Sequence, residues 1–363
     1  MIEIKVKIYG AGSIGNHLAQ ASRRAGWDVA VVDPDAKALD RMKNEIYPAR
    51  YGAWDSSIKL YKLGEEPRGG FDVIFLGTPP DVRMSMAVQC LSENPKILQL
   101  EKPIFVPLVS NEKIKEMNLF LNEIKNSNTQ VIVGHEYVLG EGIGRVEKFI
   151  GDKSLGEVES LEVVVRENWK GIFSAHPWLA GPHETYLGFW QKGGGACGEH
   201  SHAIHLWRHF SEFLGLGKVL EISAAMNIVK SDPIEYDAAS FINIRTEKGF
   251  LGYVIQDVIT DPPVVFMRIQ RKNGFVEWSR HAGPVERIKF GKLINGKWEV
   301  SEEEIKLKRP DDFYHEIMHI AKLLNNPKEA AASLVSLRSG LDALKIITAA
   351  HNSRVKGSLF VKI

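Results

Sequence analysis

The chain has 363 residues, of which 44% are apolar and 25% charged, an ordinary globular composition that excludes a disordered chain, a collagen and a small disulfide-stapled protein. Its formal net charge of +1 argues against nonspecific nucleic-acid or membrane binding, and no apolar run is long enough to span a bilayer. Two cysteines, Cys90 and Cys197, indicate free thiols, and with no room for a targeting segment before the first strand we expect a cytoplasmic protein.

The first third of the chain alternates predicted strands and helices. Strands are expected at 4–9, 29–32, 71–76, 97–100 and 130–133, and helices at 13–25, 81–91 and 113–125. Continuous apolar strands separated by amphipathic helices indicate βαβ units. We therefore predict a Rossmann domain, with a doubly wound parallel sheet, over residues 1–135.

The pattern changes after about Glu136. From Val158 the strands are longer and alternate, so that Leu161, Val163 and Val165 share one face. Further strands are expected around 219–229, 237–246, 249–257, 264–271 and 274–279, with two-residue hairpin turns at Asn273-Gly274 and Asn295-Gly296. We predict an α+β domain with a large open antiparallel sheet over 136–363, a helix at roughly 199–210, and C-terminal helices within 311–351 (about 311–324 and 330–351) that pack back toward the first domain.

A glycine-rich segment lies between the first predicted strand and helix. It fits the pattern G-x-G-x-x-G, and its expected cofactor contacts are Gly10, Gly12, Ser13, Ile14 and Gly15. In this pattern the first glycine permits a tight turn, the second lets the backbone approach a pyrophosphate, and the third lets helix and strand pack closely. The helix N-terminus offers N–H groups to the phosphates. The alternative is a turn that only packs the helix on the strand.

Asp33 ends the next predicted strand. Its carboxylate is placed to accept hydrogen bonds from the adenosine ribose hydroxyls, and it would repel a 2′-phosphate. The sequence therefore favours NAD over NADP.

Two later loops also follow parallel strands, whose carboxyl ends surround the ligand crevice in this fold. Gly77, Thr78 and Pro79 are expected to line the cofactor, or else to form a turn before a helix. Glu101-Lys102-Pro103 places a lysine where it can stabilise alkoxide charge on a substrate. From the residues alone, a solvated surface lysine is the alternative.

A glycine run leads into a histidine-bearing segment at 193–209. On a continuous helix His202 and His205 share one face, with Glu199 one turn before His202. Histidine titrates near neutral pH and is suited to removing a hydroxyl proton. Five side chains here are also metal-ligand types: Cys197, Glu199, His200, His202 and His205. Because there is no second cluster of ligand residues, we predict no bound metal. The alternative to a catalytic role for this segment is a helix that only packs between domains.

Together these motifs resemble the glucose–fructose oxidoreductase / inositol dehydrogenase / MocA family. The match rests on the glycine segment with Asp33, on Glu101-Lys102-Pro103, on the glycine-rich entry to the histidine helix, and on residues 336–344. The resemblance implies a Rossmann domain, an open antiparallel sheet, NAD(P), and oxidation or reduction of a sugar or polyol. It also implies that Lys102 is catalytic and contacts both cofactor and substrate, and that Glu101 contacts the cofactor.

In the family a catalytic histidine follows an aspartate by four residues, and this chain is one residue too short to match that spacing. Counting from the glycines places the family's aspartate at Glu199 and its histidine at Ala203. We assign His202 as the base. Glu199 is expected to take the role of the family's aspartate, and His200 is the alternative residue for that role. Substrate contacts are expected from Tyr137, Trp169, His202 and His205, in addition to Lys102. The alternative for the aromatic segment around Trp169 is that it packs against another subunit and does not contact the substrate.

We therefore predict an NAD-dependent dehydrogenase that transfers hydride between the nicotinamide and a secondary alcohol carbon of a sugar or polyol. Lys102 and His202 handle the alkoxide charge and the hydroxyl proton. A glycosidase or lyase that uses NAD without net redox change, and a noncatalytic NAD-binding regulator, are the alternatives. Because a broad antiparallel face usually needs covering, we expect a homodimer or homotetramer.

Overall fold

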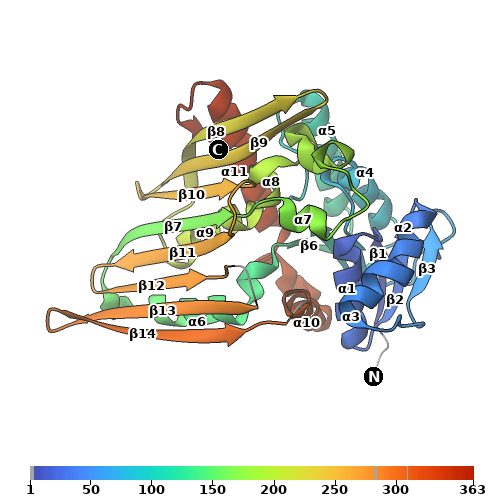
Figure 1. Ribbon diagram of the computed structural model, residues 1–363, viewed down its shortest axis with the longest axis horizontal. Helices are drawn as coiled ribbons and strands as arrows, with labels where there is room; N and C mark the ends of the chain where they lie inside the picture. Colours follow the sequence, from blue (N-terminus) through green and yellow to red (C-terminus); the bar gives the residue numbers. More distant parts are fainter. Residues whose placement is uncertain (1–3, 282–283, 309) are drawn as a thin grey trace. The chain divides into compact units, whose positions relative to one another are not determined.

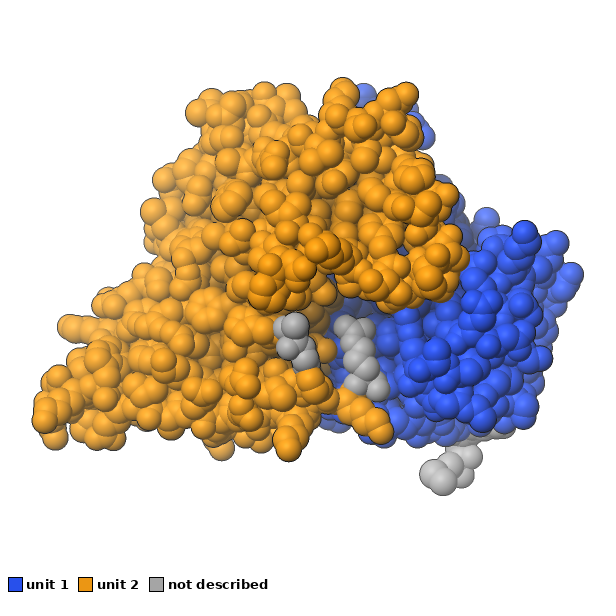
Figure 2. Space-filling model, in the orientation of Figure 1, with its two compact units in different colours: residues 1–105, 110–136, 309–340 blue, residues 106–109, 137–308, 341–363 orange. Residues whose placement is uncertain are grey.

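The computed structural model describes residues 4–281, 284–308 and 310–363. The chain folds into two compact units, coloured separately in Figure 2. The first unit comprises residues 1–105, 110–136 and 309–340, and the second comprises 106–109, 137–308 and 341–363. The first unit thus adds a C-terminal segment to the strand–helix third of the chain.

The first unit contains a six-stranded, all-parallel sheet (Figure 1). Its strands, in the spatial order β3-β2-β1-β4-β5-β6, are β3 (Lys59–Lys62), β2 (Asp28–Asp33), β1 (Lys5–Tyr9), β4 (Val73–Leu76), β5 (Ile97–Glu101) and β6 (Gln130–Gly134). All residues of the central strands β4 and β5 are buried, as expected when helices cover both faces of a parallel sheet. The doubly wound sheet predicted from the sequence is confirmed.

Helices surround this sheet. The three predicted ones are α1 (Ser13–Arg24), α4 (Pro80–Leu91) and α5 (Asn111–Lys125). The segment after β2 forms a further helical run that was not predicted, made of α2 (Ala36–Arg41), a π-helical turn (Met42–Ile46) and α3 (Tyr47–Tyr51). Near the C-terminus, α10 (Asp311–Asn325) packs against α1.

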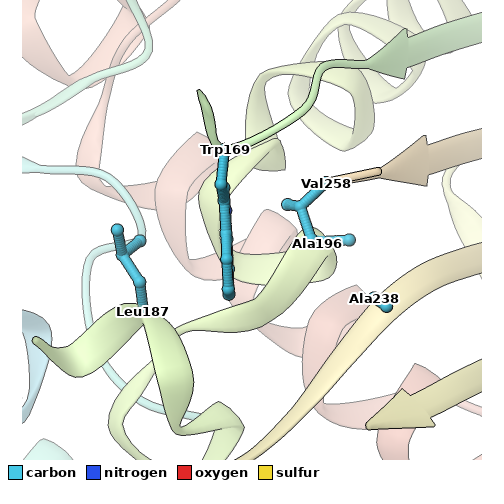
Figure 3. Packing of buried hydrophobic residues seen from close by; sticks show 5 residues of the cluster. All are labelled: Trp169, Leu187, Ala196, Ala238 and Val258. Atoms are coloured by element: carbon cyan, nitrogen blue, oxygen red, sulfur yellow. The ribbon is translucent and has the colours of Figure 1, made fainter. Parts of the chain in front are cut away.

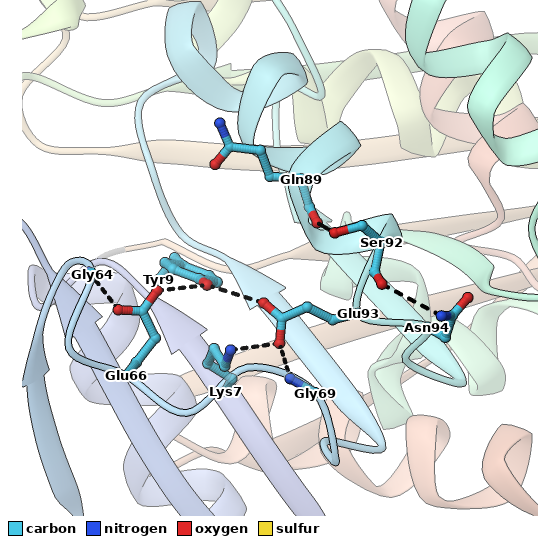
Figure 4. Close-up of polar contacts among 9 residues, drawn as sticks. All are labelled: Lys7, Tyr9, Gly64, Glu66, Gly69, Gln89, Ser92, Glu93 and Asn94. Atoms are coloured by element: carbon cyan, nitrogen blue, oxygen red, sulfur yellow. Dashed lines mark hydrogen bonds and ion pairs between the residues drawn. The ribbon is translucent and has the colours of Figure 1, made fainter.

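Strand β1 carries a fully buried lysine (Figure 4). Lys7 Nζ donates to Glu93 Oε2 at 2.6 Å and lies 4.6 Å from the centre of the Phe71 ring. Glu93 also accepts from the Gly69 N–H at 2.7 Å and from the Tyr9 hydroxyl at 3.4 Å. The ion pair therefore fastens the loop before β4 to the first strand of the sheet.

The second unit contains a nine-stranded sheet (Figure 1). Its strands, in spatial order, are β14 (Lys297–Lys306), β13 (Val285–Ile294), β12 (Gly274–Ser279), β11 (Val264–Arg271), β7 (Val158–Arg166), β10 (Leu251–Asp257), β9 (Ile234–Thr246), β8 (Val219–Ser231) and β15 (Val361–Lys362). The sheet is antiparallel as predicted except that β7 and β10 run parallel. A parallel pair needs a long crossover, and the helices and two strands between β7 and β10 supply one.

One face of this sheet packs on helices. Leu161, Val163 and Val165 of β7 are buried on a common face, as their alternation predicts. α6 (Glu141–Ile150) packs on β12 and β13, and α9 (Ser201–Phe213) packs on β7 and β10. The helix α9 thus rests on the middle of the sheet, which fixes the histidines it carries.

Several predicted boundaries differ from the structure. The long C-terminal helix is α11 (Leu337–Val355) rather than 330–351, because a 3-10 turn (Pro327–Ala332) precedes it. The hairpin between β13 and β14 turns at Asn295-Gly296, where both residues have positive φ, as predicted. The hairpin between β11 and β12 turns one residue earlier than predicted, because Gly274 already pairs with Arg271. Within the described residues, no helix has both the length and the apolar character needed to cross a membrane.

Candidate functional site

The glycine segment forms a tight turn between β1 and α1 in the first unit. Gly10 has a φ of +109°, which glycine adopts without steric cost. A Cβ at Gly15 would lie 1.8 Å from the Gly10 carbonyl oxygen, so close packing of helix on turn requires glycine there. The Asp33 carboxylate holds the turn, because it accepts the Ala11 N–H at 2.8 Å and the Asp35 N–H at 2.9 Å. The structure thus brings Asp33 and the glycine turn together.

Gly12 differs from its two neighbours in the motif. Its φ of −78° is open to any residue, and a Cβ there would meet no atom of the described residues within 4 Å. Neither backbone strain nor internal packing explains glycine at this position. A bare backbone does, however, leave the first turn of α1 open to approach from outside, where the N–H groups of Ser13 and Ile14 begin the helix. The residues present therefore fit the phosphates of a dinucleotide.

The loop after β4 lies against the same turn. Its Gly77 N–H donates to the Tyr9 carbonyl at 2.9 Å, and a Cβ at Gly10 would lie 3.1 Å from the Gly77 carbonyl oxygen. Thr78 is buried, and Pro79 directly precedes α4. Gly77 is therefore next to the glycine turn, as the cofactor-lining prediction requires.

A buried arginine ties this loop to the lysine loop. Arg83, in the first turns of α4, donates to the carbonyl oxygens of Thr78, Glu101 and Pro103. Its side chain is almost fully enclosed, at 2% exposure. One guanidinium thus fixes the backbone on both sides of Lys102. Sequence reasoning missed Arg83, although a charged residue on the inward face of a helix is a detectable signal.

Buried carboxyl groups surround the lysine loop. Gln99 Nε2 donates to Glu101 Oε1 at 3.0 Å and to Glu316 Oε1, from α10, at 3.1 Å. Burial raises the pKa of both carboxyl groups, and it raises the pKa of Glu136 to about 8. The charge of Lys102 opposes the effect of burial at Glu101 and Glu136. Lys102 thus lies near a cluster of acids whose ionisation the protein disfavours.

The histidine segment of the second unit is two helices, not one. α8 (Gly195–Glu199) ends before His200, whose φ of −94° and ψ of 27° break the helix, and α9 begins at Ser201. The helix predicted at roughly 199–210 is present as α9 (Ser201–Phe213), but it does not include Glu199, which ends α8. Glu199 and His202 belong to different helices, so regular helix geometry does not relate them.

Two strand residues hold this break in place. Asp237 of β9 accepts the Cys197 N–H at 2.7 Å, and Gln256 of β10 donates to the His200 carbonyl at 2.5 Å. A Cβ at Gly195 would lie 1.9 Å from Asp237 Oδ1, which requires glycine where the backbone has a φ of +78°. Desolvation raises the pKa of Asp237 to about 7. Both strand residues lie far from the segment in sequence, which is why the motif did not reveal them.

The His202 ring stacks on the ring of Tyr137, a residue predicted to contact the substrate. The rings of His202 and Tyr137 are 4.1 Å apart and inclined by 9°. The guanidinium of Arg280 lies 5.3 Å from the centre of the Tyr137 ring, and Trp278 meets that ring edge-on at 6.2 Å. The structure thus brings His202 and Tyr137 together, with a cation beside them.

The other predicted contacts in the second unit are more enclosed. Trp169 is 6% exposed and packs in a core cluster whose buried members, drawn in Figure 3, are Trp169, Leu187, Ala196, Ala238 and Val258. Its ring lies 4.6 Å from that of Tyr236. This packing is sufficient to explain why a tryptophan is buried at position 169. Contact between Trp169 and a substrate stays a prediction. His205 is buried, and Glu199 accepts from the Tyr186 hydroxyl at 3.4 Å.

No group of three or more His, Cys, Asp and Glu side chains among the described residues is arranged to hold a metal ion.

Solved structures share this architecture. No protein-family model matches the sequence, and no curated protein is a significant match to it. Levoglucosan dehydrogenase, solved with NADH and L-sorbose, superposes with a TM-score of 0.73 at 15% identity, over 100% of this chain and 99% of that one. The WlbA dehydrogenase from Bordetella pertussis, solved with NADH and UDP-GlcNAcA, gives 0.70 at 17% identity, over 99% of both chains. A putative myo-inositol dehydrogenase from Sinorhizobium meliloti gives 0.69 at 16% identity, over 99% of both chains.

The chain has the fold of these dehydrogenases. The likeness runs through both units at full coverage, so the two-part architecture expected from the motif resemblance is confirmed. At such low identity it establishes the fold, and the chemistry must be argued from this chain's own residues.

Proposed function

We propose that the protein is an NAD-dependent dehydrogenase of the glucose–fructose oxidoreductase / inositol dehydrogenase / MocA type, acting on a secondary alcohol of a sugar or polyol. The observation that carries the proposal is Gly12, a glycine that neither its backbone angles nor its protein neighbours require. It is explained by a phosphate group that approaches the start of α1 from outside. The structural neighbours crystallised with NADH support the same cofactor.

The cofactor preference follows from Asp33. Its carboxylate is fixed at the turn by the N–H groups of Ala11 and Asp35, and it is suited to bind ribose hydroxyls. A 2′-phosphate would bring negative charge against this carboxylate. NAD is therefore favoured over NADP.

In the proposed reaction, the His202 imidazole takes the proton of the substrate hydroxyl, and the Lys102 ammonium hydrogen-bonds the same oxygen. NAD, when bound, supplies the hydride acceptor. Tyr137 orients the His202 ring by stacking, and Arg83 holds the backbone that carries Lys102. Electrostatic stabilisation of the alkoxide by a preorganised donor contributes most when the donor does not have to move.

The proposal is tested by incubating the protein with NAD and a panel of sugars and polyols, and measuring NADH by its absorbance. We expect NADH from at least one substrate, with turnover lowered about 10²–10⁴-fold in Lys102→Met and His202→Asn. NAD affinity should be retained in His202→Asn. Substrate consumption without NADH would instead support the lyase or glycosidase, and NAD binding without any turnover would support the regulator.

We also propose a homodimer or homotetramer formed through the open face of the second sheet. Cross-strand register places Phe241, Leu251 and Tyr253 on one face of β9 and β10, where they are 45%, 56% and 38% exposed. Exposed apolar and aromatic side chains gathered on one sheet face are typical of an interface.

A further inference from the structure

One cation of the first unit lies beside the start of α1. Arg50, in α3, donates through Nη1 to the Ser13 hydroxyl at 2.8 Å and to the Ser13 carbonyl at 3.4 Å. Ser13 is the first residue of α1 and directly follows Gly12. The guanidinium is therefore carried to the turn by the helical run after β2, a part of the chain that the glycine motif does not include.

The neighbouring side chains hold Arg50 in this position. His17, one turn further along α1, lies 3.4 Å from Arg50 Nη1 through its Nε2 and contacts the Tyr51 hydroxyl through its Nδ1. The His17 ring is 5% exposed and stacks on Phe313 of α10 at 4.8 Å. Tyr51 of α3 and Phe313 of α10 thus both support the His17 ring that meets the guanidinium. An arginine held in this way loses little conformational freedom when it binds an anion.

We propose that Arg50 binds the pyrophosphate of the dinucleotide. This inference rests on the proposed function, because it assigns a second partner to the phosphates that reach the start of α1. The glycine turn offers uncharged N–H groups and the helix dipole, whereas a dinucleotide brings two negative charges. A planar guanidinium with five donors engages phosphate oxygens strongly and in defined geometry, and it can do so while keeping a bond to Ser13.

The contact with Ser13 assigns Arg50 to the phosphates and not to the ribose. It contacts Ser13, at the phosphate end of the motif, whereas the ribose hydroxyls are assigned to Asp33 at the end of β2. Arg50 should therefore respond to the pyrophosphate of NAD and NADP alike and contribute nothing to the choice between them.

The test is calorimetric titration of wild-type protein, Arg50→Gln and Arg50→Lys with NAD, NADP, ADP-ribose and adenosine. Arg24→Gln is the matched control, since Arg24 lies at the other end of α1 and pairs with Asp311 at 2.6 Å. Loss of a charge-assisted hydrogen bond should weaken NAD and ADP-ribose binding by about 10–100-fold in Arg50→Gln, with a smaller loss in Arg50→Lys. Adenosine binding should change less than twofold, and the salt dependence of NAD binding should become shallower.

The outcomes separate this inference from the function on which it rests. If Arg50→Gln binds NAD as tightly as Arg24→Gln does, or if it weakens adenosine and NAD equally, the assignment to the pyrophosphate is overturned while the proposed function stands. A loss confined to NADP would also overturn it, in favour of a 2′-phosphate contact. If wild-type protein binds neither NAD nor ADP-ribose, the proposed function itself fails. Melting temperatures of all variants identify any that are misfolded.

Discussion

The buried carboxyl group of Asp237 should make the stability of the protein depend on pH in a specific way. Asp237 is fully buried, and its Oδ1 has no hydrogen-bond partner among the described residues, whereas the Cys197 N–H donates to its Oδ2. Desolvation raises its pKa from 3.8 to about 7 in the folded protein. The folded state therefore binds a proton that the unfolded state releases, so stability is lost as pH rises from about 4 to about 7 and is level above that.

The size of this effect follows from the two pKa values. The difference between 3.8 and about 7, at about 1.36 kcal/mol per pKa unit, corresponds to roughly 4 kcal/mol in total. Between pH 5 and pH 8 the loss is about 2–3 kcal/mol. In Asp237→Asn the amide oxygen can still accept the Cys197 N–H, but there is no proton to release, so this contribution disappears.

The assay is urea unfolding of wild type and Asp237→Asn at several pH values between 5 and 8, followed by tryptophan fluorescence. The stability of the variant relative to wild type should increase by about 2–3 kcal/mol across this range. A difference between the two proteins that does not change with pH would refute the reasoning, because it would show that Asp237 titrates normally in the fold. Loss of ellipticity in the variant at all pH values would point to misfolding instead.

Three further predictions concern other parts of the molecule. Lys7→Met leaves the Glu93 carboxylate without its buried partner and should lower the free energy of unfolding by about 3–5 kcal/mol, measured by urea unfolding; a loss below about 1 kcal/mol would show that the pair contributes little. Arg83→Met should lower kcat/KM by about 10²-fold, because the loop that carries Lys102 shifts, with partial recovery in Arg83→Lys; unchanged steady-state kinetics would contradict a positioning role. Phe241→Glu combined with Tyr253→Glu should convert the proposed oligomer to monomers in sedimentation velocity, and an unchanged sedimentation coefficient would place the interface elsewhere.

The first unit was largely predictable from the sequence because its signals are local. Each of its features depends on residues close together in sequence: the glycine turn, Asp33 and the strand–helix alternation. Their geometry follows from backbone sterics and helix packing. The helical run at 36–51 was missed because its apolar positions are interrupted by charges and by Pro48. Arg50 was missed with it.

The second unit was predictable in its strands but not in its histidine segment. The break at His200 depends on Asp237 and Gln256, which lie 40 and 56 residues from the backbone groups they bind. Spacing within one segment carries no information about such partners. No residue range was predicted for strands β13 and β14, although the hairpin signal at Asn295-Gly296 indicated the turn that joins them.

The central claim, that the turn before α1 receives the phosphates of NAD, is tested most directly by adding a side chain at Gly12. Gly144, in α6, is the matched control, because a Cβ there also meets nothing within 4 Å and its φ is not positive. Gly12→Val and Gly144→Val should both keep the melting temperature of the wild type within a few degrees. In calorimetric titration, Gly12→Val should bind NAD at least about tenfold more weakly than Gly144→Val. Equal NAD affinity in the two variants, or no binding of NAD by the wild type, would contradict the account.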